Sequence, residues 1–452
     1  SQQSAQELLP LVQQAKLLAK QYDAVIANPP YMGGKGMNTA LKDFAKKKFP
    51  DSKSDMFAMF IERCQALSKI SGETAFVTPY VWMFISSYEE LRKKLVSQNT
   101  IKSLIQLEYN AFEPACIPVC AYTISKAHVK DYVGSYIKLS DFKGHENQAP
   151  KTLEAIQNPS CGWFFNAKPD DFNKIPGSPI AYWVSEKVRE IFVSNESVGD
   201  VTNAVVGLQT GDNNRFLHFW HEVSIQKIGF GMESRQQAQS SHKKWFPYNK
   251  GGEFRKWYGN QEYVVNWEND GKELFEFLPR SVIRNLSYYF KPSVSCGALT
   301  SSINAFRYIP KGFIPDVNTR SIFFDEKLNI SILNYLQSNT IAYLIQMLNP
   351  TLAFNAEQCH SLPYIKVNVS ELAESCVFLA KNDWDSYETS WDFTQNPIIR
   401  TQQPNLKQAF NTWQQQNADA VAEMKRLEEE NNKLFLCTRQ ISQNPYPIRI
   451  LL

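Results

Sequence analysis

The 452-residue sequence has no long apolar run and no secretory leader pattern. No stretch reaches the roughly 18 consecutive apolar residues that a membrane-spanning helix needs. The N-terminus also lacks the basic and then apolar order of a signal peptide. These absences lead us to expect neither membrane insertion nor export.

Paired cysteines and clustered metal ligands are also missing. The eight cysteines are scattered and form no CxxC pair, which argues against a zinc ribbon and against a disulfide framework. His218 with His221, and Cys359 with His360, form two pairs of possible ligands, but neither pair has a third and fourth ligand at usable spacing. We therefore expect no bound metal, and a protein of the reducing cytoplasm.

A strong excess of charge is absent as well. The net charge is +3, so any nucleic-acid surface must come from local clusters of basic residues and not from bulk charge. Apolar residues make up 43% and charged residues 21%, which is the profile of an ordinary globular protein. The length allows about three average domains.

What the first 125 residues do contain is an alternation of short apolar strands with amphipathic helices. Strands are expected at Asp23–Ala27, Glu73–Pro79, Ile101–Leu107 and Val119–Ser125, and helices at Ser54–Gly72 and Ser87–Gln98. The first connections are long enough for parallel crossovers, which predicts half of a doubly wound α/β sheet. The last two strands, joined without a helix, are expected to pair antiparallel at the sheet edge.

Two details of this region follow from the pattern. The first strand is continuous and apolar at its centre, so we expect it to be buried. In the first helix, Ser54 or Asp55 is expected to cap the start and Gly72 the end. An alternative role for Asp55 is to orient a neighbouring site.

The remaining sequence divides into three further parts. Gly, Pro, Asn and Asp are frequent from about Lys126 to Pro179, which is typical of a linker. Beyond it, short strands, turns and many aromatic residues indicate a second domain that is irregular α/β or β-rich, and the end of the chain becomes helical. The predicted parts of the whole chain are 1–140, 141–195, 196–400 and 401–452.

The chemistry is expected at Asn28, Pro29, Pro30 and Tyr31, directly after the first strand. Two prolines stop the sheet ladder, and the carboxyl end of a parallel strand is where open α/β sheets bind ligands. The Asn28 carboxamide oxygen and a carbonyl of the proline pair can both accept hydrogen bonds from one planar NH2 group, while the Tyr31 ring offers a stacking face. A simple proline-terminated turn is the alternative, but the strand context favours a site that polarises and positions an amine.

The order of elements around this motif resembles a known family. A strand, Asn-Pro-Pro-Tyr, a helix, "SGETAFVTP" and a later "AFEPACIPVCAYTI" are similar to the second half of an amino-methylating, adenine-specific DNA methyltransferase. In that family the Asn and the first Pro bind the target amine, and the Tyr and a second aromatic residue sandwich an adenine flipped from the duplex. The resemblance therefore assigns amine binding to Asn28 and Pro29, and stacking to Tyr31 and Phe112. For Phe112, a core aromatic is the alternative.

Five blocks in order extend the resemblance over most of the chain: "NPPYMGGKGMN", "KSDMFAMFIERC", "NAVVGLQTGDNNRFL", "FRYIPKGFIPDVNTRSIFF" and "LEEENNKLF". They are similar to the PglX family, the methyltransferases of BREX phage-defence systems. The resemblance implies the second half of a Rossmann-like methyltransferase sheet, a mixed α/β target recognition domain and a helical C-terminal segment. It implies an enzyme that methylates adenine in double-stranded DNA, with S-adenosylmethionine as cofactor. Other defence-system subunits and a phage inhibitor that mimics DNA are the further partners it implies.

The cofactor-binding signature of methyltransferases is not found. It consists of a glycine-rich loop after the first strand and an acid after the second. Only about twenty residues precede the first strand here, and the "GGKG" of residues 33–36 follows no recognisable strand-to-helix step. We therefore expect this chain to be a C-terminal portion of a larger protein, inactive and unable to bind cofactor by itself.

Basic and amide side chains suggest where DNA would be contacted. Residues 241–260 hold five Lys or Arg and six aromatic residues against one acid, a mixture typical of nucleic-acid surfaces. The alternative is a solvated hairpin with aromatic core anchors. Phosphate contacts are predicted for Lys35 in the glycine-rich loop, which is either a flap over the base or a mobile loop, and for Lys243, Lys244, Lys250, Arg255 and Lys256. The other predicted DNA contacts, several of them suited to base edges, are Asn213, Asn214, Arg215, Arg307, Lys311, Asn318 and Arg320.

Two other functions remain open at this point. Protein-glutamine methyltransferases share the same tetrapeptide, since their substrate also presents a planar NH2 group, but they need no long additional region with basic aromatic loops. The other reading is a non-catalytic module that binds DNA and partner proteins.

Overall fold

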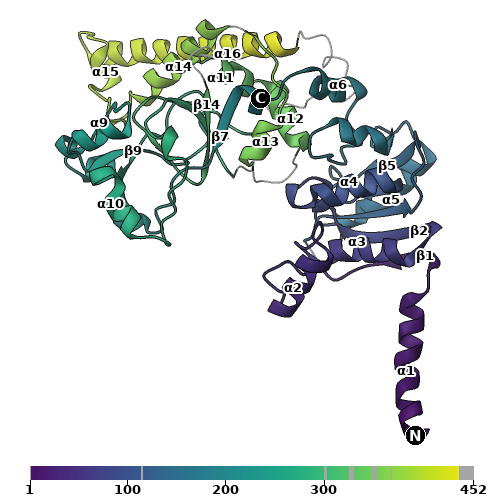
Figure 1. The fold of residues 1–452 in the computed structure, drawn as a ribbon. Helices are drawn as coiled ribbons and strands as arrows, with labels where there is room; N and C mark the ends of the chain where they lie inside the picture. Colours follow the sequence, from purple (N-terminus) through teal and green to yellow (C-terminus); the bar gives the residue numbers. More distant parts are fainter. Residues whose placement is uncertain are drawn as a thin grey trace. The chain divides into compact units, whose positions relative to one another are not determined.

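The computed structural model describes residues 2–112, 116–299, 303–324, 330–348, 354–367 and 369–436 (Figure 1). The chain divides into two compact units, Ser1–Val193 and Ser194–Leu452. Residues 437–452 of the expected helical C-terminal segment lie outside the described part. No helix that the structure describes is both long and apolar enough to span a bilayer.

A six-stranded sheet with the order β1-β2-β4-β3-β5-β6 forms the centre of the first unit. Its strands are β1 Tyr22–Ala27, β2 Ser68–Pro79, β3 Thr100–Gln106, β4 Val119–Ser125, β5 Gly134–Lys138 and β6 Phe164–Ala167. Its α-helices are α1 Gln2–Ala19, α2 Thr39–Lys48, α3 Met56–Leu67, α4 Glu89–Gln98, α5 His145–Gln157 and α6 Glu186–Ser194. Apolar residues of α3 and α4 share one core cluster with the sheet, whereas Ala155 of α5 packs in a separate cluster on strand residues of the opposite face. The α/β fold class is therefore confirmed.

The position of β4 differs from the prediction. It pairs antiparallel with β3, as expected, but it also pairs antiparallel with β2 and so lies inside the sheet. Cys120, Tyr122 and Ile124 are accordingly buried. The prediction placed β4 at an edge because it considered only β3, the strand before β4 in the sequence. The edge of β2 gives β4 a second partner along its full length.

The strand expected to be buried, β1, is instead the outermost strand. Among the described residues it pairs only with β2, and Ile26 is 82% exposed. Ile70 of β2 is 77% exposed. An apolar strand with one unpaired edge has no neighbour to cover it, so the sheet is open at β1. The helix before it, α1, likewise exposes Leu8, Leu9, Leu11, Val12, Leu17 and Leu18.

The start of α3 matches the prediction and its end does not. Asp55 is the N-cap and accepts a hydrogen bond from the backbone N–H of Phe57. The helix stops at Leu67, and Gly72 lies within β2. A Cβ at Gly72 would approach Ser68 Oγ to 2.4 Å and the Tyr22 carbonyl oxygen to 2.9 Å. Gly72 is therefore needed for the close approach of β1 to β2, not for a helix end.

The expected linker at 141–195 is a folded part of the first unit. It carries α5, β6 and α6, and β6 pairs with β5 to extend the sheet. Tyr136 of β5 stacks on Tyr182 with ring centroids 4.8 Å apart. The polar and turn-rich composition concealed this packing, because the residues that anchor the segment are a few widely spaced aromatics.

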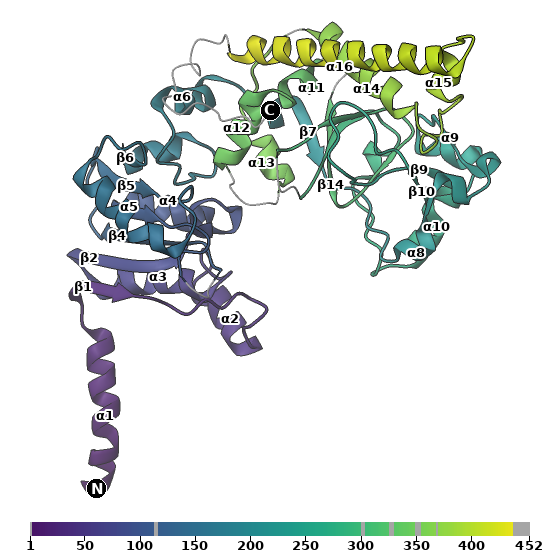
Figure 2. The ribbon, with the colours of Figure 1, turned by 180° about the vertical axis from the view of Figure 1, so that it is seen from behind.

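The second unit contains two four-stranded sheets, β13-β9-β10-β8 and β12-β11-β14-β7 (Figure 2). Its strands are β7 Thr202–Val205, β8 Leu217–Phe219, β9 Trp245–Asn249, β10 Tyr263–Asn266, β11 Ser293–Gly297, β12 Arg307–Ile309, β13 Ile314–Pro315 and β14 Thr319–Phe324. The Asn249 side chain donates hydrogen bonds to Ser295 and Ser321, which joins the two sheets.

Helices surround and follow these sheets. They are α7 Val198–Val201, α8 Asn213–Phe216, α9 Arg235–Ser240, α10 Glu268–Glu276, α11 Ser331–Leu336, α12 Asn339–Leu348, α13 Ala356–His360, α14 Ser370–Trp384, α15 Pro397–Arg400 and α16 Leu406–Leu436. The second region is thus mixed α/β followed by helices, as the sequence predicts.

Candidate active site

The Asn-Pro-Pro-Tyr segment lies where three strands of the first unit end. Strands β1 and β2 are parallel, and β2 and β3 both run antiparallel to β4, so the carboxyl ends of β1, β2 and β3 share one sheet edge. Pro29 is buried, while Asn28 and Pro30 are exposed. The prolines therefore hold the Asn28 side chain in solvent at the edge where ligands bind.

Tyr31 leans from β1 across β2. Its hydroxyl group donates to Asn28 Oδ1 at 3.4 Å and to the Val77 carbonyl oxygen at 3.3 Å. The ring is 37% exposed, and burial raises the pKa of the hydroxyl group, which therefore stays protonated. Both hydrogen bonds are long, so a substrate amine could displace the hydroxyl group from Asn28 at small cost.

Asp55 fixes the backbone that follows the motif. Its Oδ1 accepts hydrogen bonds from Met32 N at 2.9 Å and from Phe57 N at 3.3 Å. The buried Phe57 in turn meets the Tyr31 ring edge-on, with centroids 6.2 Å apart. Asp55 therefore has both roles that the sequence left open, as a helix cap and as a support for the site.

Phe112 lies in the loop after β3, at the same sheet edge, and is 52% exposed. Glu108 holds this loop: its carboxylate accepts from Asn110 N at 2.8 Å and its carbonyl group from Ala111 N at 3.2 Å. The exposure argues against a core role for Phe112. Because β2 and β4 separate β1 from β3, the ends of β1 and β3 are about 14 Å apart. The Tyr31 hydroxyl group reaches toward β3 as far as Val77 of β2.

Two further aromatic residues stand at this edge and were missed from the sequence. Tyr80 directly follows β2, is half-buried, and donates its backbone N–H to the Pro118 carbonyl oxygen at 3.0 Å. Tyr109 follows β3 and is 52% exposed. A rule that picks the first aromatic residue after each parallel strand would have found both, in "VTPY" and "LEYN".

The glycine-rich loop does not offer a cofactor cradle. It lies between β1 and α2, which corrects the expectation that it follows no strand-to-helix step. Gly34 N donates to the Ser54 carbonyl oxygen at 3.2 Å, and Gly36 N donates to that of Gly33 at 2.9 Å. These two amide groups are engaged within the protein, so the loop does not present them to a ligand. Among the described residues, no group of three His, Cys, Asp or Glu residues could hold a metal ion.

The basic stretch of the second unit is mostly tied to other parts of that unit. Most of its aromatic residues, such as Trp245 and Trp257, are buried. Arg255 pairs with Asp383 of α14 and covers the Trp384 ring, and Lys256 pairs with Glu428 of α16. These contacts argue against the predicted phosphate role of Arg255 and Lys256, and their carboxylate partners, more than 120 residues later, are invisible to local sequence reading.

The other lysines of the stretch and Lys311 have weaker or more exposed contacts. Lys243 binds the Gln226 carbonyl oxygen, and the Lys244 ammonium group lies 3.8 Å from Glu268. Lys250 lies over the Tyr263 ring at 4.3 Å, and the exposed Lys311 pairs with Glu233.

Two arginines predicted to read bases are structural. Arg307 is 3% exposed, burial lowers its pKa, and its Nη1 donates to the Arg255 carbonyl oxygen. Arg320 donates to the carbonyl oxygens of Phe354 and Val317 at 3.0 and 3.1 Å. Burial contradicts the prediction for Arg307, and the carbonyl contacts argue against base reading by the half-buried Arg320.

Several exposed donors do come together in the second unit. In the loop after β7, Leu208 forms a parallel β-bridge with Asp316. A Cβ at Gly211 would lie 2.4 Å from the Arg280 carbonyl oxygen, so this loop also packs closely against Arg280. Lys250 and Gly251 adjoin the same place, because a Cβ at Gly251 would lie 3.9 Å from the Asn318 carbonyl oxygen. We call these residues the donor loop cluster: the exposed Asn213 and Asn214 at the start of α8, the exposed Arg280, Arg284 and Asn318, and the half-buried Lys250. Arg280 and Arg284 were missed, although "PRSVIRN" shows both. Arg215, which follows Asn213 and Asn214 in the sequence, is instead paired with Glu273 at 3.1 Å.

Comparison with known proteins identifies the relationship. Residues 3–112 match the family model of the Eco57I restriction-modification methylase. The chain is 36% identical over 449 residues to the adenine-specific methyltransferase PglX of Lacticaseibacillus casei (strain Zhang), which covers 95% of this chain and 37% of that protein. It is 40% identical over 405 residues to the adenine-specific methyltransferase BrxX of Escherichia coli O9:H4 (strain HS), or 88% of this chain and 32% of that one. The chain is thus similar over most of its own length to two adenine-specific methyltransferases.

The resemblance to PglX is thereby confirmed, and the chain spans about a third of the length of the curated relatives it matches. Over 91% of its length it also superposes on the Type IIL restriction-modification enzyme MmeI, solved in complex with DNA. The TM-score is 0.54 at 11% sequence identity, and the match covers 53% of that chain. This likeness shows a shared fold.

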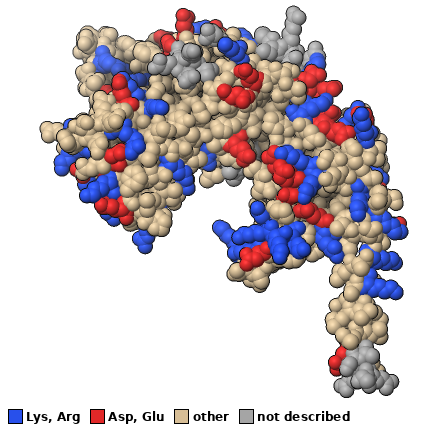
Figure 3. Space-filling model, viewed as in Figure 1, with Lys and Arg blue, Asp and Glu red and all other residues tan. Residues whose placement is uncertain are grey.

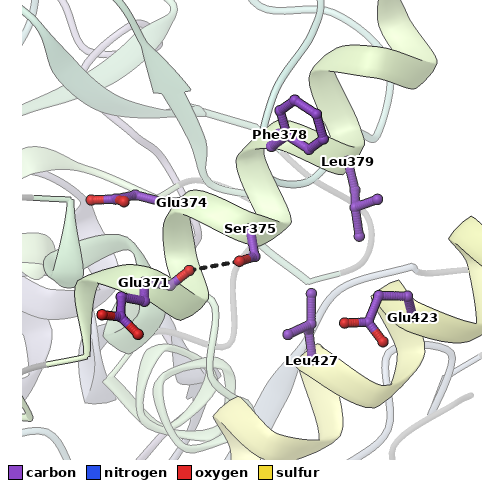
Figure 4. A pocket seen from close by; sticks show the side chains of 7 residues that line it. All are labelled: Glu371, Glu374, Ser375, Phe378, Leu379, Glu423 and Leu427. Carbon is purple, nitrogen blue, oxygen red and sulfur yellow. Dashed lines mark hydrogen bonds between the residues drawn. The ribbon is translucent and has the colours of Figure 1, made fainter.

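A cavity of about 520 Å³ in the second unit lies between α14 and α16 (Figure 4). Its lining combines carboxylates with apolar side chains: Glu371, Glu374, Ser375, Phe378, Leu379, Glu423 and Leu427. Carboxylates repel phosphate, so this lining disfavours contact with DNA.

Glu428 offers a test of how the helices hold the sheets of the second unit. It accepts hydrogen bonds from the indole N–H of the buried Trp257 at 2.7 Å and from Lys256 at 3.1 Å. Glu428→Ala would leave the indole donor without an acceptor, so we expect the free energy of unfolding to fall by about 1–3 kcal/mol in urea titrations. Glu429→Ala, at an exposed neighbour, is the control. Equal effects of the two substitutions would contradict this role.

Proposed function

We propose that the chain is the substrate-handling part of a site-specific DNA adenine methyltransferase that marks host DNA in a phage-defence system. The reaction is methyl transfer from S-adenosylmethionine to the exocyclic amine of an adenine flipped out of the duplex. The observation that carries the proposal is the sheet edge itself. There the exposed Asn28 and the leaning Tyr31 share one ligand-binding edge with the exposed Phe112.

Each residue at the edge has a defined task. Asn28 Oδ1 and the Pro29 carbonyl oxygen each accept a hydrogen bond from one N–H of the planar amine. These bonds position the amine nitrogen and increase its electron density. Tyr31 and Phe112 stack on the two faces of the base, an interaction worth about 1–3 kcal/mol per base. No acid or base of unusual pKa is needed at this edge.

The second unit serves as the target recognition region. Its donor loop cluster combines Asn side chains, which suit adenine, with Arg side chains, which suit guanine. A phage protein that mimics DNA would compete for the same cluster, and other defence-system subunits would bind elsewhere. The second unit also disfavours a protein-glutamine methyltransferase, whose substrate requires no such region.

The cofactor must be held by residues other than those described. The open edge and exposed Ile26 of β1 provide the place where further strands would continue the sheet. The chain alone would then act as a DNA-binding module, and activity would require the protein with its cofactor-binding half.

Sequencing that detects methylated adenine tests the proposal. Genomic DNA from cells that carry the complete gene is compared with DNA from cells that lack it. We expect adenine methylation at one short sequence motif in the first sample only. Identical methylation patterns, combined with methylated glutamine in a cellular protein, would establish the glutamine-methylating function instead.

A further inference from the structure

Six exposed lysines lie on and beside one short helix of the first unit. Of the six, only Lys35 has been given a role above. They lie on α2 and its two flanks: Lys35, Lys42, Lys46, Lys47, Lys48 and Lys53. Figure 3 shows the blue side chains gathered over α2. None of the six forms an ion pair within the described residues, whereas several other lysines of the same unit do, such as Lys69 with Asp23 and Lys102 with Glu73.

Helix stability explains only part of this cluster. Lysines in the last turn complement the helix dipole by about 0.3–1 kcal/mol, which could account for Lys46, Lys47 and Lys48. The helix dipole does not account for Lys42, Lys53 or Lys35. Like charges one turn apart also destabilise a helix. The exposed Phe44, on the same helix, adds an apolar surface among the lysines. Such a cluster is relieved by an anionic ligand.

The helix is held firmly beside the candidate active site. Asn38 caps α2 by accepting from Leu41 N at 2.9 Å. Met37 and Ala45 pack on Met59 of α3. Asp55, at the start of α3, also accepts a hydrogen bond from the backbone N–H of Met32, next to Tyr31. The lysine cluster is therefore connected through α3 to the Asn28–Tyr31 segment.

We infer that the α2 lysine cluster binds backbone phosphates of the DNA next to the flipped adenine. The inference rests on the proposed function and adds to it a second, sequence-independent contact surface in the catalytic unit. Lysine ammonium groups are compact point charges without the planar geometry that reads a base edge, so phosphate is the ligand they suit. The cluster therefore contributes affinity and orientation, but no sequence selectivity.

The test measures salt-dependent binding of the 452-residue chain to two short fluorescent duplexes, one with the methylated motif and one with that motif scrambled. The triple variant Lys42→Gln, Lys46→Gln, Lys47→Gln is compared with a control of equal charge loss on α16, Lys407→Gln, Lys425→Gln, Lys433→Gln. Each lost phosphate contact should reduce the slope of log K against log salt by about 0.9. We expect the α2 variant to lose up to about 2.7 units of slope on both duplexes alike. The control should match the wild-type chain.

Two further results keep the outcome clear. Lys42→Arg, Lys46→Arg, Lys47→Arg retains the charge and should bind as the wild type does, and circular dichroism of each variant verifies folding. An α2 Gln variant with the wild-type slope, or one weakened only on the motif duplex, would overturn the inference while the proposed function stands. A wild-type chain that binds neither duplex would overturn both.

Discussion

Asn28→Ala is expected to lower adenine methylation by at least about 10²–10³-fold in the protein that includes the cofactor-binding half, with DNA affinity almost unchanged. Asn28 is exposed just after β1, and within the part of the chain that the structure describes its side chain accepts one hydrogen bond, from Tyr31 at 3.4 Å. The substitution therefore removes an acceptor for the target amine without disturbing the fold. Phosphate contacts, which dominate DNA affinity, remain in place.

Single-turnover transfer of labelled methyl groups and fluorescence anisotropy on the same duplex measure the two quantities separately. Asn110→Ala is the matched control, since Asn110 is an exposed asparagine at the same sheet edge whose structural bond is made by its backbone. It should keep methylation within a few-fold of the wild type. Loss of both methylation and DNA binding in Asn28→Ala, or of neither, would refute the assignment.

The second large effect concerns the cofactor. The 452-residue chain alone is expected to give no saturable heat with S-adenosylmethionine in calorimetry and no methylation. The amides of the glycine-rich loop are used within the protein, and the sheet is open at β1. Saturable binding by the chain alone would contradict this expectation.

Ile26 tests the physical basis of that expectation. In the chain alone it is 82% exposed, so Ile26→Lys should change the free energy of unfolding by no more than about 0.5 kcal/mol. In the longer protein, where we propose that further strands cover β1, the same substitution should cost roughly 3–5 kcal/mol, because it buries an unpaired charge. Unfolding curves of both proteins in urea measure the difference. A small effect in the longer protein would show that β1 stays uncovered.

The predictions from sequence succeeded where neighbouring residues decide the structure. The Asn-Pro-Pro-Tyr turn, the Asp55 cap and the α/β alternation each depend on residues a few positions apart. They failed where the partner lies far along the chain. Residues 141–195 joined the first sheet through the Tyr136–Tyr182 stack, and β4 found a second partner in β2.

The predicted DNA contacts divide along the same line. Lys35, Asn213 and Asn318 are exposed, as their loop positions suggested. Arg255 and Lys256 proved to be paired with carboxylates of α14 and α16, which no local pattern indicates. A basic residue is equally common in a phosphate contact and in an ion pair, so only the position of the acids separates the two cases.

The sequence by itself indicated where the proposed amine site lies, because its residues are contiguous and two prolines fix their backbone. It also determined the α/β class, through the local periodicity of apolar residues. Only the tertiary structure decided which surfaces carry that chemistry. Arg307 is buried, and Arg320 donates to backbone carbonyl oxygens. The strand order leaves β1 at an open edge, and the lysines of α2 form no ion pair within the described residues. Those properties depend on contacts between distant segments, which the order of residues does not display.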